Sequence, residues 1–150
     1  MEFRNDLYPT DPAQLAAMAE PGPAGPIVMV NLLKFRERAV YADGRESNLS
    51  GREAYDIYGA AVARLIFATG GRILFAGDVS FLSLGMANPL WDEVALAEYP
   101  TRADFTRMAM SDAWREISVH RAAGLEGQLN IETSWKTGLR EKLAGMAGAA

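Results

Sequence analysis

The 150-residue chain contains no cysteine and a single histidine, His120. Without cysteine there is no disulfide, no thiolate nucleophile, no iron–sulfur cluster and no cysteine-ligated zinc. One histidine alone also disfavours an all-protein transition-metal site, so we expect no metal and no cofactor. A haem bound through His120 is the one option that a single histidine leaves open.

Basic charge and long apolar runs are scarce as well. The chain has 15 Lys and Arg against 19 Asp and Glu, which gives a net charge of −4. This balance argues against nucleic-acid binding, and no polybasic stretch indicates binding to an anionic membrane. No apolar run approaches the ~20 residues that span a bilayer, and the first residues lack the apolar core of a signal peptide. We therefore expect a cytoplasmic protein.

Several familiar catalytic motifs are missing. The patterns G-x-G-x-x-G, Walker A, G-x-S-x-G and H-E-x-x-H do not occur, which disfavours nucleotide-dependent, serine-hydrolase and zincin chemistry. The chain does have 49% hydrophobic and 23% charged residues, the composition of an ordinary soluble domain with a sizeable core.

Cap and turn signals divide the chain into segments. Residues 1–25 are predicted to form an N-terminal extension with a short helix after Asp11-Pro12. Apolar runs then predict strands over 27–35, 72–82, 91–99 and 126–135. Capping patterns at Ser50, Thr101 and Ser111 predict helices over 51–68, from 102 and over 112–123. The tail, 136–150, is expected to be a frayed helix or disordered.

Two strand–helix–strand halves with short strand-to-strand connections predict an α+β fold for residues 26–135. The arrangement is the ferredoxin-like split β-α-β, with a four-stranded antiparallel sheet and its helices on one face. The other face would carry an unusual number of aliphatic side chains, namely Val28, Val30, Leu32, Val94 and Leu96. A second copy packed sheet against sheet would cover them, so we predict a homodimer.

Six segments together resemble a known family. They are Val30-Asn31-Leu32-Leu33-Lys34-Phe35, Gly51-Arg52-Glu53-Ala54-Tyr55, Gly70-Gly71, Trp91-Asp92-Glu93-Val94, Tyr99-Pro100-Thr101 and Ile117-Ser118-Val119-His120-Arg121-Ala122-Ala123-Gly124-Leu125. In this combination the chain resembles the DUF1330 group of the dimeric α+β barrel superfamily over about residues 26–135. The resemblance implies a ferredoxin-like protomer and a homodimer joined through its sheet faces. It implies no reaction, because the wider superfamily includes monooxygenases, isomerases and haem-binding enzymes.

Asn31 is a polar residue in the middle of the most apolar predicted strand. An unpaired buried amide costs roughly 1–3 kcal/mol, so its side chain must find partners. It either braces the fold through hydrogen bonds or faces a pocket. In a pocket it would donate to a substrate carbonyl or a developing oxyanion.

His120 is predicted near the end of the helix over 112–123. An imidazole can exchange protons near neutral pH, which suits a general base. The alternative is a structural role, in which the ring caps or packs the helix. We expect His120 and Asn31 to approach one cavity, with His120 transferring a proton and Asn31 stabilising the oxyanion.

Aromatic candidates accompany these two residues. Tyr55 and Tyr58 lie on the inward stripe of the helix over 51–68, where they form either core or pocket wall. Trp91 lies at the start of the strand over 91–99, on the same alternation as Glu93. We expect these aromatic side chains to line a substrate site.

Charged candidates are fewer. Glu93 is either a buried carboxylate of the site or the partner of Arg72 on the neighbouring strand. Arg121, with Arg36, would hold an anionic substrate, since a guanidinium binds a carboxylate through two parallel hydrogen bonds.

The sequence favours a small-molecule-binding protein, acting as a cofactor-independent enzyme on a small apolar metabolite. A non-catalytic ligand-binding protein and a purely structural homodimer are the alternatives, and the residue pattern does not separate the three.

Overall fold

The computed structural model describes residues 7–149 and confirms the predicted α+β fold. Its strands are β1 (Ile27–Phe35), β2 (Arg72–Asp78), β3 (Glu93–Tyr99) and β4 (Leu125–Ser134). Its helices are α1 (Pro12–Met18), α2 (Gly51–Ala68), α3 (Arg102–Ala109), α4 (Asp112–Gly124) and α5 (Leu139–Ala149). The predicted extension over 1–25 and tail over 136–150 also include residues 1–6 and 150, which lie outside the described residues.

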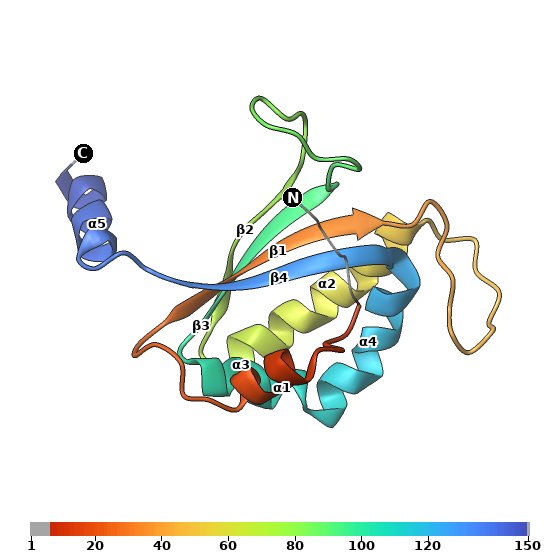
Figure 1. Ribbon diagram of the computed structural model, residues 1–150, viewed down its shortest axis with the longest axis horizontal. Helices are drawn as coiled ribbons and strands as arrows, with labels where there is room; N and C mark the ends of the chain where they lie inside the picture. The colour runs from red at the N-terminus through yellow and green to blue at the C-terminus, as the bar shows by residue number, and fades with distance from the viewer. Residues whose placement is uncertain (1–6, 150) are drawn as a thin grey trace.

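The four strands form one antiparallel sheet in the order β2-β3-β1-β4. With the helices inserted after β1 and β3, this is the ferredoxin-like β-α-β-β-α-β arrangement. Figure 1 shows α1 to α4 on one side of the sheet and α5 standing apart beyond the end of β4. The sheet and these four helices therefore form two layers.

The predicted helix starts are confirmed by their caps. Ser50 Oγ accepts a hydrogen bond from Glu53 N at 3.0 Å, and Glu53 Oε1 accepts one from Ser50 N at 2.9 Å, which completes a capping box. The hydroxyls of Thr101 and Ser111 likewise accept from the N–H three residues later. Each cap satisfies N–H groups that a helix start leaves unpaired.

A pair of glycines lets α2 begin directly against the end of α4. A Cβ on Gly51 would overlap the carbonyl oxygen of Arg36, and one on Gly124 would overlap the carbonyl oxygen of Gly51. Only glycine permits so close a backbone approach. The contact fixes the position of α4, and with it the side chains that α4 turns toward the sheet.

The core lies between the sheet and the helix layer. Alternate residues of β1 point into it, and both Ile27 and Leu33 are fully buried. From α2, the side chains of Tyr58, Val62 and Ile66 pack against this face at the spacing expected of a helix. Asn31, at the centre of β1, is one of these alternate residues that face the helices.

Two strands are shorter than predicted. The strand expected over 72–82 ends at Asp78, and the one expected over 91–99 begins at Glu93. These two residues pair in the ladder, and beyond them the chain leaves the sheet as a connection over 79–92. In the tail, residues 139–149 form the helix α5, which is the helical one of the two alternatives predicted there.

The sheet face away from α1 to α4 is apolar. Val28, Val30, Leu74 and Leu96 line a shallow hollow of about 260 Å³ on this face, closed at one end by Trp135. Within residues 7–149, no helix is long and apolar enough to cross a membrane.

Candidate functional site

Asn31 lies on the helix-facing side of β1, and its side chain joins three strands. Its Nδ2 donates to Met29 O at 3.3 Å and to Ala95 O at 3.2 Å. Its Oδ1 accepts from Gln128 Nε2 and from Asn130 Nδ2, both at 2.7 Å. The amide hydrogens and the oxygen lone pairs of Asn31 are therefore all engaged within the fold.

The hydrogen-bond chain continues from Gln128 to α4. Gln128 Oε1 accepts from Arg121 Nε at 3.2 Å and from Arg121 Nη2 at 2.7 Å. The third guanidinium nitrogen, Nη1, is buried and has no hydrogen-bond partner within residues 7–149. Buried polar groups in folded proteins are almost always paired, so this nitrogen calls for an explanation.

Aromatic rings surround the guanidinium. The Arg121 Cζ atom lies 5.9 Å from the ring centre of Trp114 and 5.7 Å from that of Tyr8. Trp114 Nε1 donates to the hydroxyl of Tyr58 at 3.0 Å, and the ring centres of Tyr58 and Tyr55 are 5.4 Å apart. We refer to Arg121, Gln128, Asn31, Tyr8, Trp114, Tyr58 and Tyr55 as the Arg121 cluster.

Burial is the main influence on the Tyr55 and Tyr58 phenol groups of the cluster. Burial raises the pKa of the Tyr55 and Tyr58 hydroxyls, so both are neutral at physiological pH. The positive charge of Arg121 acts on both pKa values in the opposite direction. The guanidinium has no counter-ion among its described hydrogen-bond partners.

His120 is turned toward a different part of the molecule. Its Nδ1 shares a 2.7 Å hydrogen bond with the hydroxyl of Tyr41, and the two rings meet edge to face. Tyr41 is buried, and Arg45 lies 4.6 Å from its ring centre. Adjacent residues on a helix point about 100° apart, which is why Arg121 reaches β4 while His120 contacts the segment over 36–50. The described hydrogen bonds do not join His120 to Asn31.

Glu93 begins β3 and lies in the same row of the sheet as Leu33 and Gln128, and Trp91 comes just before this strand. Glu93 Oε2 is 3.3 Å from Arg52 Nη1 and Arg72 pairs with Glu98 at 3.4 Å, so the alternative of an arginine partner for Glu93 is met by Arg52 and not by Arg72. Burial raises the pKa of the Glu93 carboxyl, while the charge of Arg52 opposes that shift. Trp91 belongs to the connection before β3.

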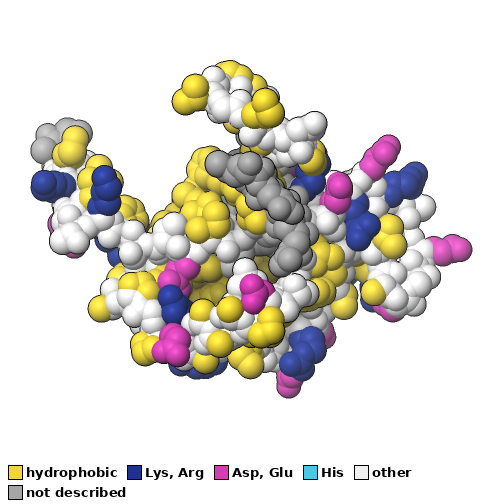
Figure 2. All heavy atoms as spheres, viewed as in Figure 1, with side chains coloured by type: hydrophobic (Ala, Val, Ile, Leu, Met, Phe, Trp, Pro, Cys, Tyr) yellow, Lys and Arg dark blue, Asp and Glu magenta, His cyan; other side chains and the backbone are white. Residues whose placement is uncertain are grey.

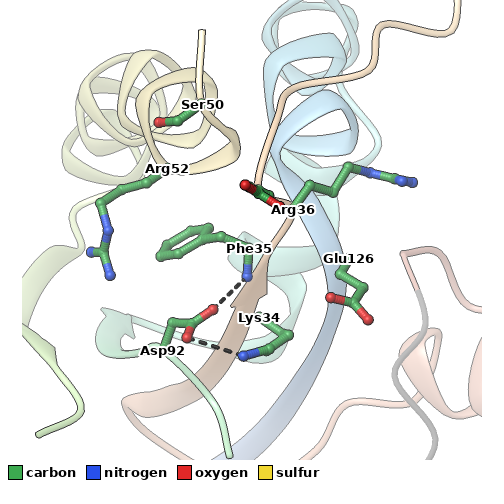
Figure 3. Close-up of a pocket in the computed structure, with 8 residues that line it drawn as sticks. Lys34, Phe35, Arg36, Ser50, Arg52, Asp92 and Glu126 are labelled. Atoms are coloured by element: carbon green, nitrogen blue, oxygen red, sulfur yellow. Dashed lines mark hydrogen bonds and ion pairs between the residues drawn. The ribbon is translucent and has the colours of Figure 1, made fainter. Parts of the chain in front are cut away.

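A larger hollow of about 550 Å³ opens where β1 meets the start of α2 (Figure 3). Asp92 accepts hydrogen bonds there from Phe35 N at 2.8 Å and from Lys34 Nζ at 3.2 Å. Arg52 lies over the Phe35 ring, 4.6 Å from its centre. Arg36 also lines this hollow, and its Nε donates to Leu125 O. Within this hollow Lys34 and Asp92 form an ion pair, whereas Arg52 pairs with Asp78 and Glu93, which do not line it.

The structure therefore brings together Asn31, Tyr55, Tyr58 and Arg121, whereas His120 bonds to Tyr41 and Glu93 pairs with Arg52. Sequence reasoning missed Gln128, Trp114 and Tyr8 as members of the cluster. A signal for Gln128 was present. Polar Gln128 and Asn130 alternate with apolar Leu129 and Ile131 along the last strand, on the side that faces the helices.

Comparison with known proteins supplies a family. No protein-family model and no curated protein matches the chain. The crystal structure of the methylated RPA0582 protein is similar, with 34% identity and a TM-score of 0.77 over 89% of this chain and 98% of that one. A second structure of RPA0582, described as a protein of unknown function from Rhodopseudomonas palustris, gives 31% identity and a TM-score of 0.76 over 89% and 99% of the two chains.

A dabb family protein with a ferredoxin-like fold from Mesorhizobium loti is more distant. It shares 12% identity at a TM-score of 0.45, over 75% of this chain and 98% of its own. The two RPA0582 comparisons, in contrast, extend over nearly the whole of that protein at more than 30% identity. The chain belongs to the same family as the RPA0582 protein of Rhodopseudomonas palustris.

Proposed function

We propose that this protein binds a small anionic molecule, with a carboxylate or a comparable oxyanion, at the Arg121 cluster. The observation that carries the proposal is the buried Arg121 Nη1, which has no hydrogen-bond partner within residues 7–149. Leaving a buried donor unpaired costs roughly 1–3 kcal/mol, and more for a charged group. A folded protein can retain such an unpaired donor when a bound ligand supplies the missing hydrogen-bond acceptor.

The hydrogen bonds that orient the Arg121 guanidinium favour an anionic ligand. Gln128 holds the Nε and Nη2 edge of Arg121, so the remaining nitrogen has a defined direction. An anionic oxygen at Nη1 would receive a charge-assisted hydrogen bond, which is roughly twice as strong as a neutral one. The cluster therefore favours an anion over a neutral carbonyl.

The rings around the guanidinium suit the rest of the ligand. Trp114, Tyr55 and Tyr58 supply flat, largely apolar surfaces within the helix layer. Tyr8 remains about half exposed, so its segment marks the side from which a ligand enters. Sites of this composition bind small molecules with an apolar body and one charged end.

Binding is supported more directly than catalysis. Both amide hydrogens of Asn31 already donate to backbone carbonyls, and His120 Nδ1 is engaged by Tyr41. Proton transfer to a ligand steadied by Asn31 would have to use the other ring nitrogen of His120, Nε2, and would require Asn31 to release a backbone carbonyl. A cofactor-independent enzyme acting at the same cluster is the second candidate, and turnover of a bound anion would establish it.

Isothermal titration with benzoate and with inorganic phosphate tests the proposal. We expect the wild-type chain to bind benzoate, and Arg121→Met to weaken that binding about 10- to 100-fold, the loss of one or two charge-assisted hydrogen bonds. Arg115→Met is the matched control, because Arg115 lies on the same helix with its guanidinium exposed and should leave binding unchanged. Equal affinity in wild type and Arg121→Met would refute the proposal.

We further infer a homodimer formed through the apolar sheet face, in keeping with the resemblance to the DUF1330 group. The observation behind it is the uncovered row of aliphatic side chains on β1 and β3, exemplified by Val30 and Leu96. An antiparallel sheet with helices on one face needs a partner for an apolar second face. Sedimentation equilibrium tests it, and a stable 16.3 kDa monomer at micromolar concentration would contradict it.

A further inference from the structure

Two segments project from the sheet on the side away from α1 to α4. One is the connection over 79–92 between β2 and β3, and the other is α5 (Figure 1). We call them the loop arm and the helix arm. Figure 2 shows hydrophobic side chains on both arms, beside Lys and Arg side chains on the helix arm.

The root of the loop arm is held firmly. Val79 N donates to Asp92 O at 2.9 Å and Asp92 N donates to Leu33 O at 2.8 Å, which closes the arm against the sheet. The Asp92 carboxylate adds bonds from Phe35 N and Lys34 Nζ. The direction in which the arm leaves the sheet is therefore fixed.

The root of the helix arm is held by a buried carboxylate on the apolar sheet face. Glu98 is 6% exposed, and its two oxygens accept from Trp135 Nε1 at 2.8 Å and from Arg140 Nη2 at 3.0 Å. Arg72 approaches the same carboxylate at 3.4 Å. Trp135 before α5 and Arg140 in its first turn thereby hold the chain to this face.

Beyond these roots both arms expose apolar side chains. In the loop arm, Leu84 is 90% exposed and Met86 is 89% exposed. The arm carries no charged residue from Val79 to Trp91, which is unusual for a solvated loop. Structureless connections of this length are uncommon in compact domains and are usually functional. In the helix arm, Met146 and Leu143 are exposed as well.

We propose that the two arms clasp a second copy of this chain, so that each protomer's arms lie on its partner and extend the contact between the sheet faces. This inference rests on the homodimer proposed above. The arms and the apolar face lie on the same side of the molecule, so an isologous dimer brings each pair of arms to the other protomer.

The exposed apolar area of the sheet face and the arms is large enough for an interface with a second copy of the chain. Nine large apolar side chains of the face and arms are exposed: Phe75, Phe81, Leu82, Leu84, Met86, Ile131, Leu139, Leu143 and Met146. At roughly 150–200 Å² for a large side chain, their exposed fractions amount to about 800–1,100 Å² in each copy. A standard specific interface buries about 800 Å² per partner. The arms contribute most of that area, so the sheet face alone would make a weaker dimer.

Arm variants distinguish this clasp from a plain contact between sheets. We expect Leu84→Asp with Met86→Asp, and separately Leu143→Asp with Met146→Asp, to raise the dimer dissociation constant at least about 100-fold. Phe67→Asp is the matched control, since Phe67 is 78% exposed but lies on α2 in the helix layer. Sedimentation velocity measures the constants, and circular dichroism confirms that each variant is folded.

Cross-linking tests the position of the loop arm directly. The chain has no cysteine, so Leu84→Cys accepts a benzophenone maleimide at one site only. Illumination should give covalent dimers with this variant and none with the labelled Phe67→Cys chain.

The outcomes separate the two proposals. A wild-type monomer would overturn the homodimer and the clasp together. A wild-type dimer whose dissociation constant is unchanged by either arm variant would overturn the clasp for that arm and leave the homodimer standing. A monomer that sediments with phosphatidylcholine vesicles would assign the arms to a membrane surface instead.

Discussion

The substitution Asn31→Ala tests whether the side-chain amide of Asn31 stabilises the sheet or binds a ligand. Asn31 makes four hydrogen bonds, two short ones to β4 side chains and two longer ones to backbone carbonyls. A net hydrogen bond contributes about 0.5–1.5 kcal/mol, with the long ones near the lower limit. Gln128 is partly buried and would lose its acceptor, whereas Asn130 is exposed and regains water. We therefore expect a loss of about 2–4 kcal/mol in the free energy of unfolding.

Urea unfolding at one fixed protein concentration is the assay, because dimerisation makes apparent stability depend on concentration. Asn130→Ala is the control and should cost less than about 1 kcal/mol. A double-mutant cycle between Asn31→Ala and Gln128→Ala should give a coupling of about 1 kcal/mol. If Asn31→Ala costs less than about 0.5 kcal/mol and instead abolishes benzoate binding, the amide serves the ligand and our reasoning is refuted.

Three further predictions concern glycine packing, the hydrogen bond between His120 and Tyr41, and the dependence of stability on pH. Gly124→Ala should lower the free energy of unfolding by at least about 2 kcal/mol, since its Cβ would lie 2.9 Å from Tyr55 N and closer still to a carbonyl oxygen. Gly59→Ala, in open space on α2, should raise it by about 0.5–1 kcal/mol in the same urea titration. His120→Ala should lower the Tm by roughly 2–6 °C and speed proteolysis of the segment over 36–50, because the bond to Tyr41 holds that segment; an unchanged Tm would contradict this role. The arginine partner of Glu132 lowers the pKa of its carboxyl, so this pair stabilises the fold above the ordinary glutamate pKa and the contribution disappears as pH falls through the lowered value. An acid titration followed by circular dichroism should therefore show less loss of stability in Glu132→Gln than in wild type.

Local patterns were enough to predict most of the fold. The capping box at Ser50 and Glu53 and the apolar stripe of α2 depend on neighbours three or four residues apart, so the sequence itself displays them. The apolar run of β1 and the order of elements then determine a ferredoxin-like sheet. The end of β2 was not predictable in this way, because a strand ends where its partner ends, and β3 begins only at Glu93.

Candidate residue types were also visible in the sequence, but their grouping was not. Arg121 and His120 are adjacent in the chain, and only the packing of α4 against β4 on one side and Tyr41 on the other sends them to different neighbours. Asn31 was expected to need hydrogen-bond partners, while its partner Gln128 is 97 residues away in sequence. Hydrogen bonds between distant strands depend on register, which only the assembled sheet defines.

The sequence by itself determined the elements, the absence of cysteine chemistry and the presence of an apolar second sheet face, because these follow from residue type and short-range periodicity. The tertiary structure alone decided that Arg121 would have one buried nitrogen unpaired among residues 7–149 and that two apolar arms would project beyond the sheet. Burial and pairing are properties of the packed chain, since each depends on which distant residues come together.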